Sequence, residues 1–380
     1  MFTLIKNVHV VSPEDLGIQD LLICDEKIVK VAPKIEFSWD EDEFEVIDGK
    51  GRIAVPGFLD QHVHIIGGGG EDGFRSLITD VKMTDCIKSG VTTVVGLLGT
   101  DSTAKNVESL VAKARGLTEQ GITAYCLTGA YNYPSPTLTG SVAKDVAFLP
   151  EVLGVKLAIS DHRSSNVSKE ELARLAMDVR KASLLAGKPG VIHMHTGKGK
   201  VGLKDVMAVV KETDVPIKHF RPTHCGNLFD DAIAFGKMGG YIDFTTGRDG
   251  EICANHVLKA MEEVDFSLIS MSSDSNGSMP VWNEKREIIG MGVGKMTSLF
   301  GTVKVLVQNH GMPLEKAVSL ITQNVAKALG LYPRKGCIAK GSDADLVLLD
   351  ENLEIQTVYA KGRKMMFDRQ IIVKDYYQYE

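Results

Sequence analysis

The sequence contains no Cys-x-x-Cys pair, and its six cysteines are widely separated: Cys24, Cys86, Cys126, Cys225, Cys253 and Cys337. This spacing argues against a disulfide framework and against a thiolate zinc site, so we expect the cysteines to be reduced and mostly buried. No apolar run approaches the roughly 20 residues that a bilayer-spanning helix needs. The sequence therefore excludes a membrane-spanning protein.

Positive charge is not concentrated anywhere, because the net charge of −6 is spread along the chain without a lysine or arginine block. Proteins that follow a phosphate backbone carry such blocks, so nucleic acid is not expected as a partner. The start of the chain lacks the basic segment, apolar stretch and small-residue cleavage site of an export signal. We predict a cytoplasmic protein.

Both ends of the chain carry short strand-forming runs separated by polar turns, which is typical of a small antiparallel sheet. The runs cover residues 4–5, 8–11, 21–24 and 27–31 near the start, and 344–349, 357–360 and 370–373 near the end. Because chain termini often lie close together, we predict one small β-sandwich domain built from residues 1–54 and 335–380. The 380 residues leave room for one barrel of about 250 to 300 residues between these segments.

Residues 55–334 alternate between buried strands and helix-forming segments. Residues 107–119 predict a helix that stops at Gly121, and Ser168 begins a capping box for a helix through about Leu185. About eight strands are expected, near residues 56–64, 90–98, 122–127, 152–158, 190–195, 217–223, 241–245 and 266–271. Eight such units predict an α/β fold, a (β/α)8 TIM barrel with its active site at the carboxyl ends of the strands.

Polar side chains occur at or near these strand ends, and they are of the types that bind divalent metals. His62 and His64 are two residues apart on a strand, so both imidazoles point to one side and can bind one ion. An isolated pair of this kind is also typical of core histidines bonded to neighbouring carbonyls. The full candidate set is His62, His64, Lys156, His195, His224 and Asp274. Nitrogen and oxygen ligands suit zinc or a neighbouring first-row ion.

Lys156 is unexpected beside a metal, because two cations repel each other. Burial and nearby positive charge lower the pKa of an amine, however, and a neutral amine can react with CO2 to form a carbamate anion. Its two oxygens can bridge two ions at the roughly 3.5 to 4 Å separation of two-metal sites. One ion would bind His62, His64 and Asp274, and the other His195 and His224. An ordinary solvated lysine is the alternative.

The remaining histidines are expected to be less direct participants. His193 shares a face with His195 but lies further from the carboxyl end of its strand, so we expect at most a supporting role. Surface or packing positions are expected for His9, His162, His219, His256 and His310.

Several strings resemble a known family across essentially the whole chain. Residues 56–64 (PGFLDQHVH), Asp274 and residues 340–347 (KGSDADLV) are similar to the amidohydrolase superfamily. Longer strings at 62–71, 95–100, 127–131, 159–163 and 273–278 resemble isoaspartyl dipeptidases (β-aspartyl peptidases). The resemblance implies two zinc ions, a carboxylated lysine, a homo-oligomer, and hydrolysis of dipeptides whose aspartate is linked through its side-chain carbonyl.

The expected mechanism uses a hydroxide that bridges the two ions, since a bound ion can lower the pKa of water to about 7. Asp274 would accept its proton and deliver it to the leaving amine, although a helix N-cap is the simpler role for this residue. By resemblance, Tyr131 would donate its phenol to the carbonyl oxygen as charge builds there. Tyr133 is a rival, and a structural tyrosine is the alternative.

A zwitterionic dipeptide needs an anion for its ammonium group and a cation for its α-carboxylate. Glu71, which follows four glycines, fits the first, and Arg163 fits the second because it can form two parallel bonds. A solvated glutamate and a surface ion pair are the alternatives. The resemblance adds Gly69, Thr100 and Ser278 as substrate contacts.

One departure from the family bears on the substrate. An arginine is expected shortly after the sixth-strand histidine, but the string here is His224-Cys225-Gly226-Asn227-Leu228. A second carboxylate clamp is therefore missing unless Arg221 or Arg248 replaces it. Three alternatives stay open: a cyclic-amide hydrolase of the dihydroorotase or hydantoinase kind, a mononuclear deaminase, and a non-catalytic assembly protein on the same barrel.

Overall fold

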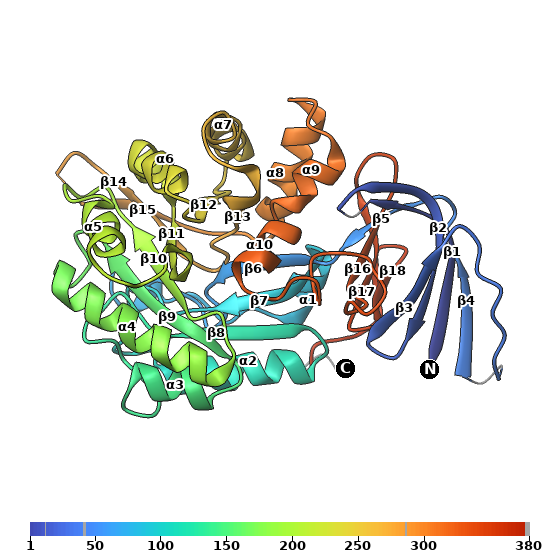
Figure 1. Ribbon diagram of the computed structural model, residues 1–380, viewed down its shortest axis with the longest axis horizontal. Coiled ribbons are helices and arrows are strands. Elements are labelled where there is room, and N and C mark those ends of the chain that lie inside the picture. Colours follow the sequence, from blue (N-terminus) through green and yellow to red (C-terminus); the bar gives the residue numbers. More distant parts are fainter. Residues whose placement is uncertain (12, 41–42, 286, 377–380) are drawn as a thin grey trace.

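The computed structural model describes residues 1–11, 13–40, 43–285 and 287–376. An α/β body lies beside a β-sheet to which both ends of the chain contribute (Figure 1). In that figure the first strands, in blue, and the last strands, in red, stand side by side although they are far apart in the sequence.

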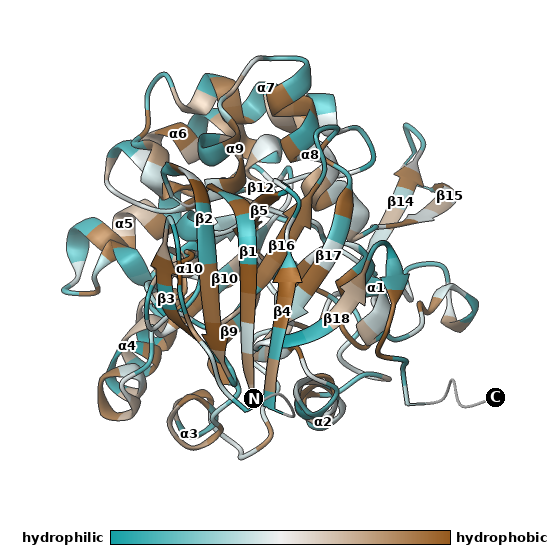
Figure 2. Cartoon of the chain, turned by 90° about the vertical axis from the view of Figure 1, so that its right-hand side faces the viewer, coloured by the Kyte–Doolittle hydropathy of each residue, from teal (hydrophilic) through white to brown (hydrophobic). Residues whose placement is uncertain are grey.

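The terminal sheet contains nine strands in the described part of the chain. They are β1 (Phe2–Val11), β2 (Asp15–Cys24), β3 (Lys27–Ala32), β4 (Phe44–Asp48), β5 (Ile53–Pro56), β16 (Leu346–Leu349), β17 (Ile355–Ala360), β18 (Arg363–Phe367) and β19 (Gln370–Ile371). β5 pairs antiparallel with β16 and so joins the two ends of the chain. Figure 2 looks onto this sheet, whose strands alternate between hydrophobic and hydrophilic segments.

The expected sandwich strands form one hydrogen-bonded sheet, and it branches at β1. β1 pairs with β4 over residues 2–6 and with β5 at residues 9–10. The runs at 4–5 and 8–11, which were expected as separate strands, both belong to β1. Lys6-Asn7 between them shifts the register of the strand and does not form a turn. Asn7 has φ +56°, a conformation that asparagine tolerates better than most residues.

Eight parallel strands of the α/β body correspond to the eight expected from the sequence. Six form one sheet: β6 (Phe58–Val63), β7 (Val91–Gly96), β8 (Thr123–Gly129), β9 (Val152–Ile159), β10 (Val191–Thr196) and β11 (Phe220–Thr223). β12 (Ile242–Thr245) and β13 (Ile269–Ser272) form a second. β11 and β13 are shorter than expected, because single turns of 3-10 helix at 217–219 and 266–268 precede them.

Side chains and one loop contact connect both edges of the six-stranded sheet, β11 and β6, to the two-stranded sheet. Thr223 of β11 and Gln61 of β6 each donate a hydrogen bond of 2.7 Å to Asp243 of β12. The His64 amide also donates to the carbonyl of Ser275, just past β13, at 2.9 Å. β11 therefore lies beside β12, and β13 beside β6.

Helices cover the outside of these strands in Figure 1. They are α1 (Met83–Lys88), α2 (Val107–Glu119), α3 (Val142–Phe148), α4 (Lys169–Ala186), α5 (Lys204–Glu212), α6 (Phe229–Lys237), α7 (Gly250–Ala260), α8 (Thr297–Gln308), α9 (Leu314–Ser319) and α10 (Gln323–Ala328). The predicted capping box of α4 is present, and Gly187 ends this helix at φ +63°. None of the described helices has the length and apolar character needed to cross a bilayer.

A hairpin that the sequence did not predict follows β13. It consists of β14 (Ser278–Trp282) and β15 (Ile288–Val293) and projects from the body in Figure 2. All six cysteines are free and only Cys24 is partly exposed, which agrees with the expectation from their spacing.

Candidate active site

The candidate ligands stand where strands end and the backbone turns. His62 lies in β6 and His64 directly follows it, whereas His224 and Asp274 follow β11 and β13. His224 and Asp274 have φ values of +58° and +54°, in the left-handed region that non-glycine residues rarely adopt. Such conformations cost of order 1 to 3 kcal/mol and persist where surrounding structure holds them. The fold thus keeps two of these side chains in a constrained geometry.

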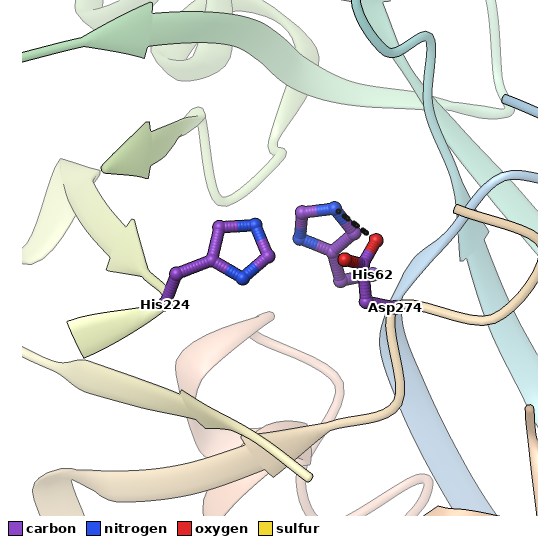
Figure 3. Close-up of side chains that lie close together, drawn as sticks. All are labelled: His62, His224 and Asp274. Atoms are coloured by element: carbon purple, nitrogen blue, oxygen red, sulfur yellow. Dashed lines mark ion pairs between the residues drawn. The ribbon is translucent and has the colours of Figure 1, made fainter. Parts of the chain in front are cut away.

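His62, His224 and Asp274 form a compact group of potential metal ligands. One ligand atom of each lies within 4.8 Å of the others. Figure 3 shows the three side chains gathered together. Asp274 Oδ1 lies 3.3 Å from His62 Nε2 and 3.1 Å from His64 Nε2, yet it is buried without a hydrogen-bond partner among the described residues. A buried carboxylate oxygen normally has a partner, so this arrangement fits a divalent cation.

The protonation states suit metal binding. Burial lowers the pKa of His62 and of His224 well below its usual range, helped by neighbouring imidazoles and by Lys156, so both rings are neutral at pH 7. For Asp274, burial raises the pKa, but His64, His224 and Lys156 outweigh it and the net shift is downward. The site therefore offers neutral imidazoles and an ionised carboxylate.

Lys156 is fully buried in β9, so it is not the solvated lysine that the sequence left open. Its Nζ lies 3.5 Å from His62 Nε2. Burial lowers the pKa of the amine to about 7, although Asp274 and Asp243 oppose this shift. A substantial fraction of the amine is thus neutral at pH 7, which is the form that can react with CO2.

His195 lies beside the three-residue group, but both of its ring nitrogens are hydrogen-bonded to other residues. Its Nε2 is 3.0 Å from Asp161 Oδ2, and its Nδ1 is 2.6 Å from the hydroxyl of Tyr131. Burial lowers the pKa of His195 to about 4, against the effect of Asp161, so the ring is neutral. Because the carboxylate can only accept, Nε2 carries the proton and Nδ1 accepts from the phenol. The rings of His195 and His224 are 4.6 Å apart.

Tyr131 is the tyrosine that faces the site. Burial raises its pKa well above the usual value, so it remains a neutral hydrogen-bond donor. It lines the small cavity described below, whereas its rival Tyr133 does not and is partly buried against the hydrophobic core.

Glu71 and Arg163 are paired with each other. Glu71 Oε1 accepts hydrogen bonds from Ser278 Oγ (2.6 Å), Thr100 Oγ1 (3.1 Å) and Arg163 Nη1 (3.2 Å). Its Oε2 is buried and has no hydrogen-bond partner among the described residues. The two groups that were expected to bind opposite ends of a substrate are therefore paired with each other.

Asp161 is a residue that the sequence analysis did not single out. It forms two parallel bonds with Arg163, from Nε to Oδ1 and from Nη2 to Oδ2, each 3.0 Å long, and it also bonds His195. Burial lowers the pKa of Arg163, but the Asp161 carboxylate and other nearby acidic groups together outweigh this effect, so the net shift of the pKa is upward. The position of Asp161 just past β9, the strand that carries Lys156, was the sequence signal that could have marked it as a site residue.

A cavity of about 60 Å³ joins these features. It is lined by His64, Gly68, Gly69, Gly99, Thr100, Tyr131, Arg163, His195, Asp274, Ser278 and Pro280. Gly69 is required sterically, because it has φ +91° and a Cβ there would stand 2.2 Å from the Ser76 carbonyl oxygen. A larger cavity of about 700 Å³ lies alongside, between residues 159–168 and 198–206, and contains none of the candidate metal ligands.

The other candidates lie away from this cavity or support it. His193 Nε2 is 2.9 Å from His62 Nδ1, which is a supporting position. Arg221 is buried, donates to backbone carbonyls of Phe220 and Ala328, and stacks on Tyr241, so it does not reach the cavity. Arg248 is exposed in the loop after β12, and its Nη2 lies against Gly292 of the hairpin.

The remaining histidines occupy surface or packing positions. His9 pairs with Asp15 and His310 with Glu251, both at the surface, and His256 stacks on Phe229. His219 is buried and bonds the carbonyl of Gly190 at 2.8 Å, and His162 is exposed.

The model of the amidohydrolase family matches residues 53–365 of the chain. Among solved structures, the β-aspartyl dipeptidase of Fervidobacterium islandicum AW-1 in complex with the β-Asp-Leu dipeptide is 37% identical, with a TM-score of 0.94 over 99% of this chain and 100% of that one. A second structure of a β-aspartyl dipeptidase from the same organism is 36% identical, with a TM-score of 0.91 and the same coverage.

Curated relatives are more distant. A dihydroorotase of Elusimicrobium minutum (strain Pei191) is 24% identical over 405 aligned positions, which cover 94% of this chain and 90% of the relative. The resemblance inferred from the sequence strings is thus confirmed by both the family match and the solved structures.

Proposed function

Because this chain belongs to the amidohydrolase family, we propose that it is a metal-dependent hydrolase that cleaves the β-aspartyl (isoaspartyl) amide bond of dipeptides. We take the six-stranded and two-stranded parallel sheets as one (β/α)8 barrel of residues 55–334, and the terminal sheet as a small domain of residues 1–54 and 335–380. The similarity to two β-aspartyl dipeptidase structures supports the substrate class.

One observation carries the proposal. A single cavity is lined by candidate metal-site residues on one side, His64, His195 and Asp274, and on the other by Arg163 and two hydroxyl groups that bond Glu71. A cyclic amide has no free ammonium group and so offers the unpartnered Glu71 Oε2 no positively charged partner. A dipeptide with a free amino group does, so the buried Glu71 favours the dipeptide.

The proposed site includes two divalent ions, and zinc is the metal we expect. His62, His64, Asp274, His195 and His224 would hold them, together with a carbamate formed on Lys156 from CO2; for His195 this requires release of its bond to Asp161 or to Tyr131. Such ions supply Lewis acidity and lower the pKa of bound water. The neutral Lys156 amine that a carbamate requires is available at pH 7.

The side chains themselves divide the remaining tasks. Asp274, which is ionised and largely buried, can accept a proton and pass it to the leaving amine. Tyr131 can turn its phenol from His195 toward the carbonyl oxygen of the scissile bond. Substrate binding would open the pair between Glu71 and Arg163, with the ammonium group at the unpartnered Glu71 Oε2 and the α-carboxylate at Arg163 Nη1.

The test is a side-by-side assay of the purified, zinc-loaded protein with β-Asp-Leu, α-Asp-Leu, hydantoin and dihydroorotate. We expect turnover of β-Asp-Leu and at least tenfold slower turnover of the other three. Turnover of hydantoin or dihydroorotate without β-Asp-Leu would replace the proposal with a cyclic-amide hydrolase. A protein that binds no divalent ion and turns over none of the four would be the non-catalytic alternative.

A Glu71→Gln variant tests recognition of the ammonium group. Hydrogen bonds to charged groups contribute about 1.5 to 3 kcal/mol, so kcat/KM for β-Asp-Leu should fall about 10- to 100-fold while bound zinc stays unchanged. N-acetyl-β-Asp-Leu serves as the matched control, because it lacks the ammonium group. Its kcat/KM should differ little between wild type and variant. Equal rates of the two proteins on β-Asp-Leu would remove the role of Glu71.

Carbamate formation on Lys156 should depend on pH in a defined direction. With a pKa of about 7, the amine loses its proton as the pH rises, from about one-tenth neutral at pH 6 to about nine-tenths at pH 8. We therefore expect the carbamate signal in ¹³C-bicarbonate NMR of the metal-free protein to grow from pH 6 to pH 8. A Lys156→Met variant should lack the signal, and a signal independent of pH, or present in that variant, would contradict the assignment.

A further inference from the structure

Asp243, in β12, is a buried carboxylate that accepts four hydrogen bonds and is neither a candidate metal ligand nor a candidate substrate contact. Oδ1 accepts from Gln61 Nε2 (2.7 Å) and Ser270 Oγ (3.0 Å). Oδ2 accepts from Ser272 Oγ (2.6 Å) and Thr223 Oγ1 (2.7 Å). Because a carboxylate accepts about four hydrogen bonds, all of its capacity is used. The donors come from three strands, β6, β11 and β13.

These bonds fall where the backbone ladders stop. In the described part of the chain, β12 pairs with β13 alone, and the six-stranded sheet ends at β11 on one side and β6 on the other. The bond from Thr223 joins β11 to β12, between which no backbone ladder forms among the described residues. The bond from Gln61 reaches β6 across β13, where the backbone contact is the one from the His64 amide to the Ser275 carbonyl. The side chain of Asp243 thus links strands where the described backbone pairing is absent or reduced to a single contact.

The donors are also placed next to the candidate ligands in sequence. Gln61 directly precedes His62, Thr223 directly precedes His224, and Ser272 lies two residues before Asp274. These three ligands are the ones whose donor atoms gather within 4.8 Å. One residue of strand advances only about 3.3 Å, so the separations of the donors limit the separations of the ligands.

We propose that Asp243 is a positioning residue: its carboxylate draws β6, β11 and β13 to the spacing at which His62, His224 and Asp274 contribute to the metal site. The inference rests on the metal site proposed above. Asp243 itself does not touch the ion; it acts through Gln61, Thr223 and Ser272. Partners that orient metal ligands typically change metal affinity by about 10- to 100-fold when they are removed.

The experiment measures the dissociation constant for Zn²⁺ of the metal-free full-length protein, in competition with a chromophoric chelator. Asp243→Ala removes all four bonds and should raise the constant about 10- to 100-fold. Asp243→Asn keeps the volume and one acceptor oxygen, and the hydroxyls of Ser272 and Thr223 can turn to accept from its amide. This variant should recover much of the affinity.

Asp145→Ala is the matched control. Asp145 is equally buried and also accepts four hydrogen bonds, from Thr128 Oγ1 (2.5 Å), Leu138 N (2.9 Å), Thr139 N (2.9 Å) and Thr139 Oγ1 (2.5 Å). In the sequence, none of its donors lies within two residues of a candidate metal ligand. Its loss should lower the thermal unfolding midpoint of the metal-free protein as Asp243→Ala does, but leave the Zn²⁺ affinity at the wild-type value.

The outcomes separate this inference from the proposed function. Wild type that binds no Zn²⁺ would overturn both. Wild type that binds Zn²⁺, with Asp243→Ala unchanged or Asp145→Ala equally weakened, would overturn the positioning role alone. If Asp243→Ala does not fold, Thr223→Val decides, because it removes one bond at nearly constant volume and should weaken Zn²⁺ binding several-fold. Wild-type affinity in that variant would contradict the inference.

Discussion

Replacing Lys156 with alanine is expected to abolish measurable hydrolysis of β-Asp-Leu and to lower the metal bound per chain. The side chain is fully buried and its Nζ is 3.5 Å from His62 Nε2, so its removal takes away the amine on which the proposed bridging carbamate would form. Metal ions contribute several kcal/mol to transition-state stabilisation, which corresponds to a rate loss of roughly a thousandfold or more.

A second variant separates this chemistry from packing. Lys156→Ala also leaves a hole in the core, and large-to-small substitutions there cost about 2 to 5 kcal/mol of folding free energy. Lys156→Met keeps an unbranched side chain of similar length without the amine. We expect it to restore the thermal unfolding midpoint while activity and metal content stay low. Metal analysis by mass spectrometry and kcat/KM on β-Asp-Leu are the measurements.

Full activity in Lys156→Met would contradict the bridging role and would favour a site in which Lys156 only fills space. A variant that keeps one ion per chain and loses the second would indicate that binding of the second ion depends on Lys156. Two ions retained with activity lost would instead assign Lys156 a part in the reaction other than metal binding.

The strand-end positions could be predicted from the sequence because they follow from local rules. Residues i and i+2 of a strand share a face, which placed His62 beside His64, and the alternation of strands and helices placed His224 and Asp274 at the same end. The capping box at Ser168 is equally local and was found where the pattern put it. Each of these inferences needs only a few neighbouring residues.

The rest depended on contacts between distant parts of the chain. Glu71 and Arg163 are 92 residues apart, and a sequence pattern cannot show that they pair with each other. Asp161 was overlooked because an aspartate in a loop usually has a turn or surface role. The hairpin β14–β15 was missed because its strands contain glycine and proline, which strand patterns penalise.

The joining of the sheets was also beyond the sequence pattern. Eight strands were expected, yet the spacing of strands does not reveal that the regular backbone ladder ends at β11 on one side and at β6 on the other. A buried aspartate in the middle of an apolar strand, Asp243, was the available signal. Carboxylates are almost never fully buried unless they are paired or fully hydrogen-bonded, so such a residue marks a place where side chains replace backbone contacts.

Asp274→Asn is expected to lower kcat on β-Asp-Leu by about 100- to 10,000-fold, the contribution typical of a positioned acid-base group. The imidazoles around Asp274 hold its pKa below the usual value, against the effect of burial, so the wild-type group is ionised and can accept a proton at neutral pH. An amide has the same shape but accepts no proton there. Turnover should therefore fail at the step that delivers a proton to the leaving amine.

Asparagine is the substitution of choice because of the backbone at this position. Asp274 has φ +54°, which asparagine tolerates and alanine does not, so the thermal unfolding midpoint of the metal-free variant should stay close to that of wild type. The amide also keeps one oxygen near His62 and His64, so some metal should remain bound. If metal content is retained and kcat still falls, the loss belongs to proton transfer. A variant that keeps its metal and turns over β-Asp-Leu within tenfold of wild type would rule Asp274 out as the acid-base group, leaving it as a ligand only.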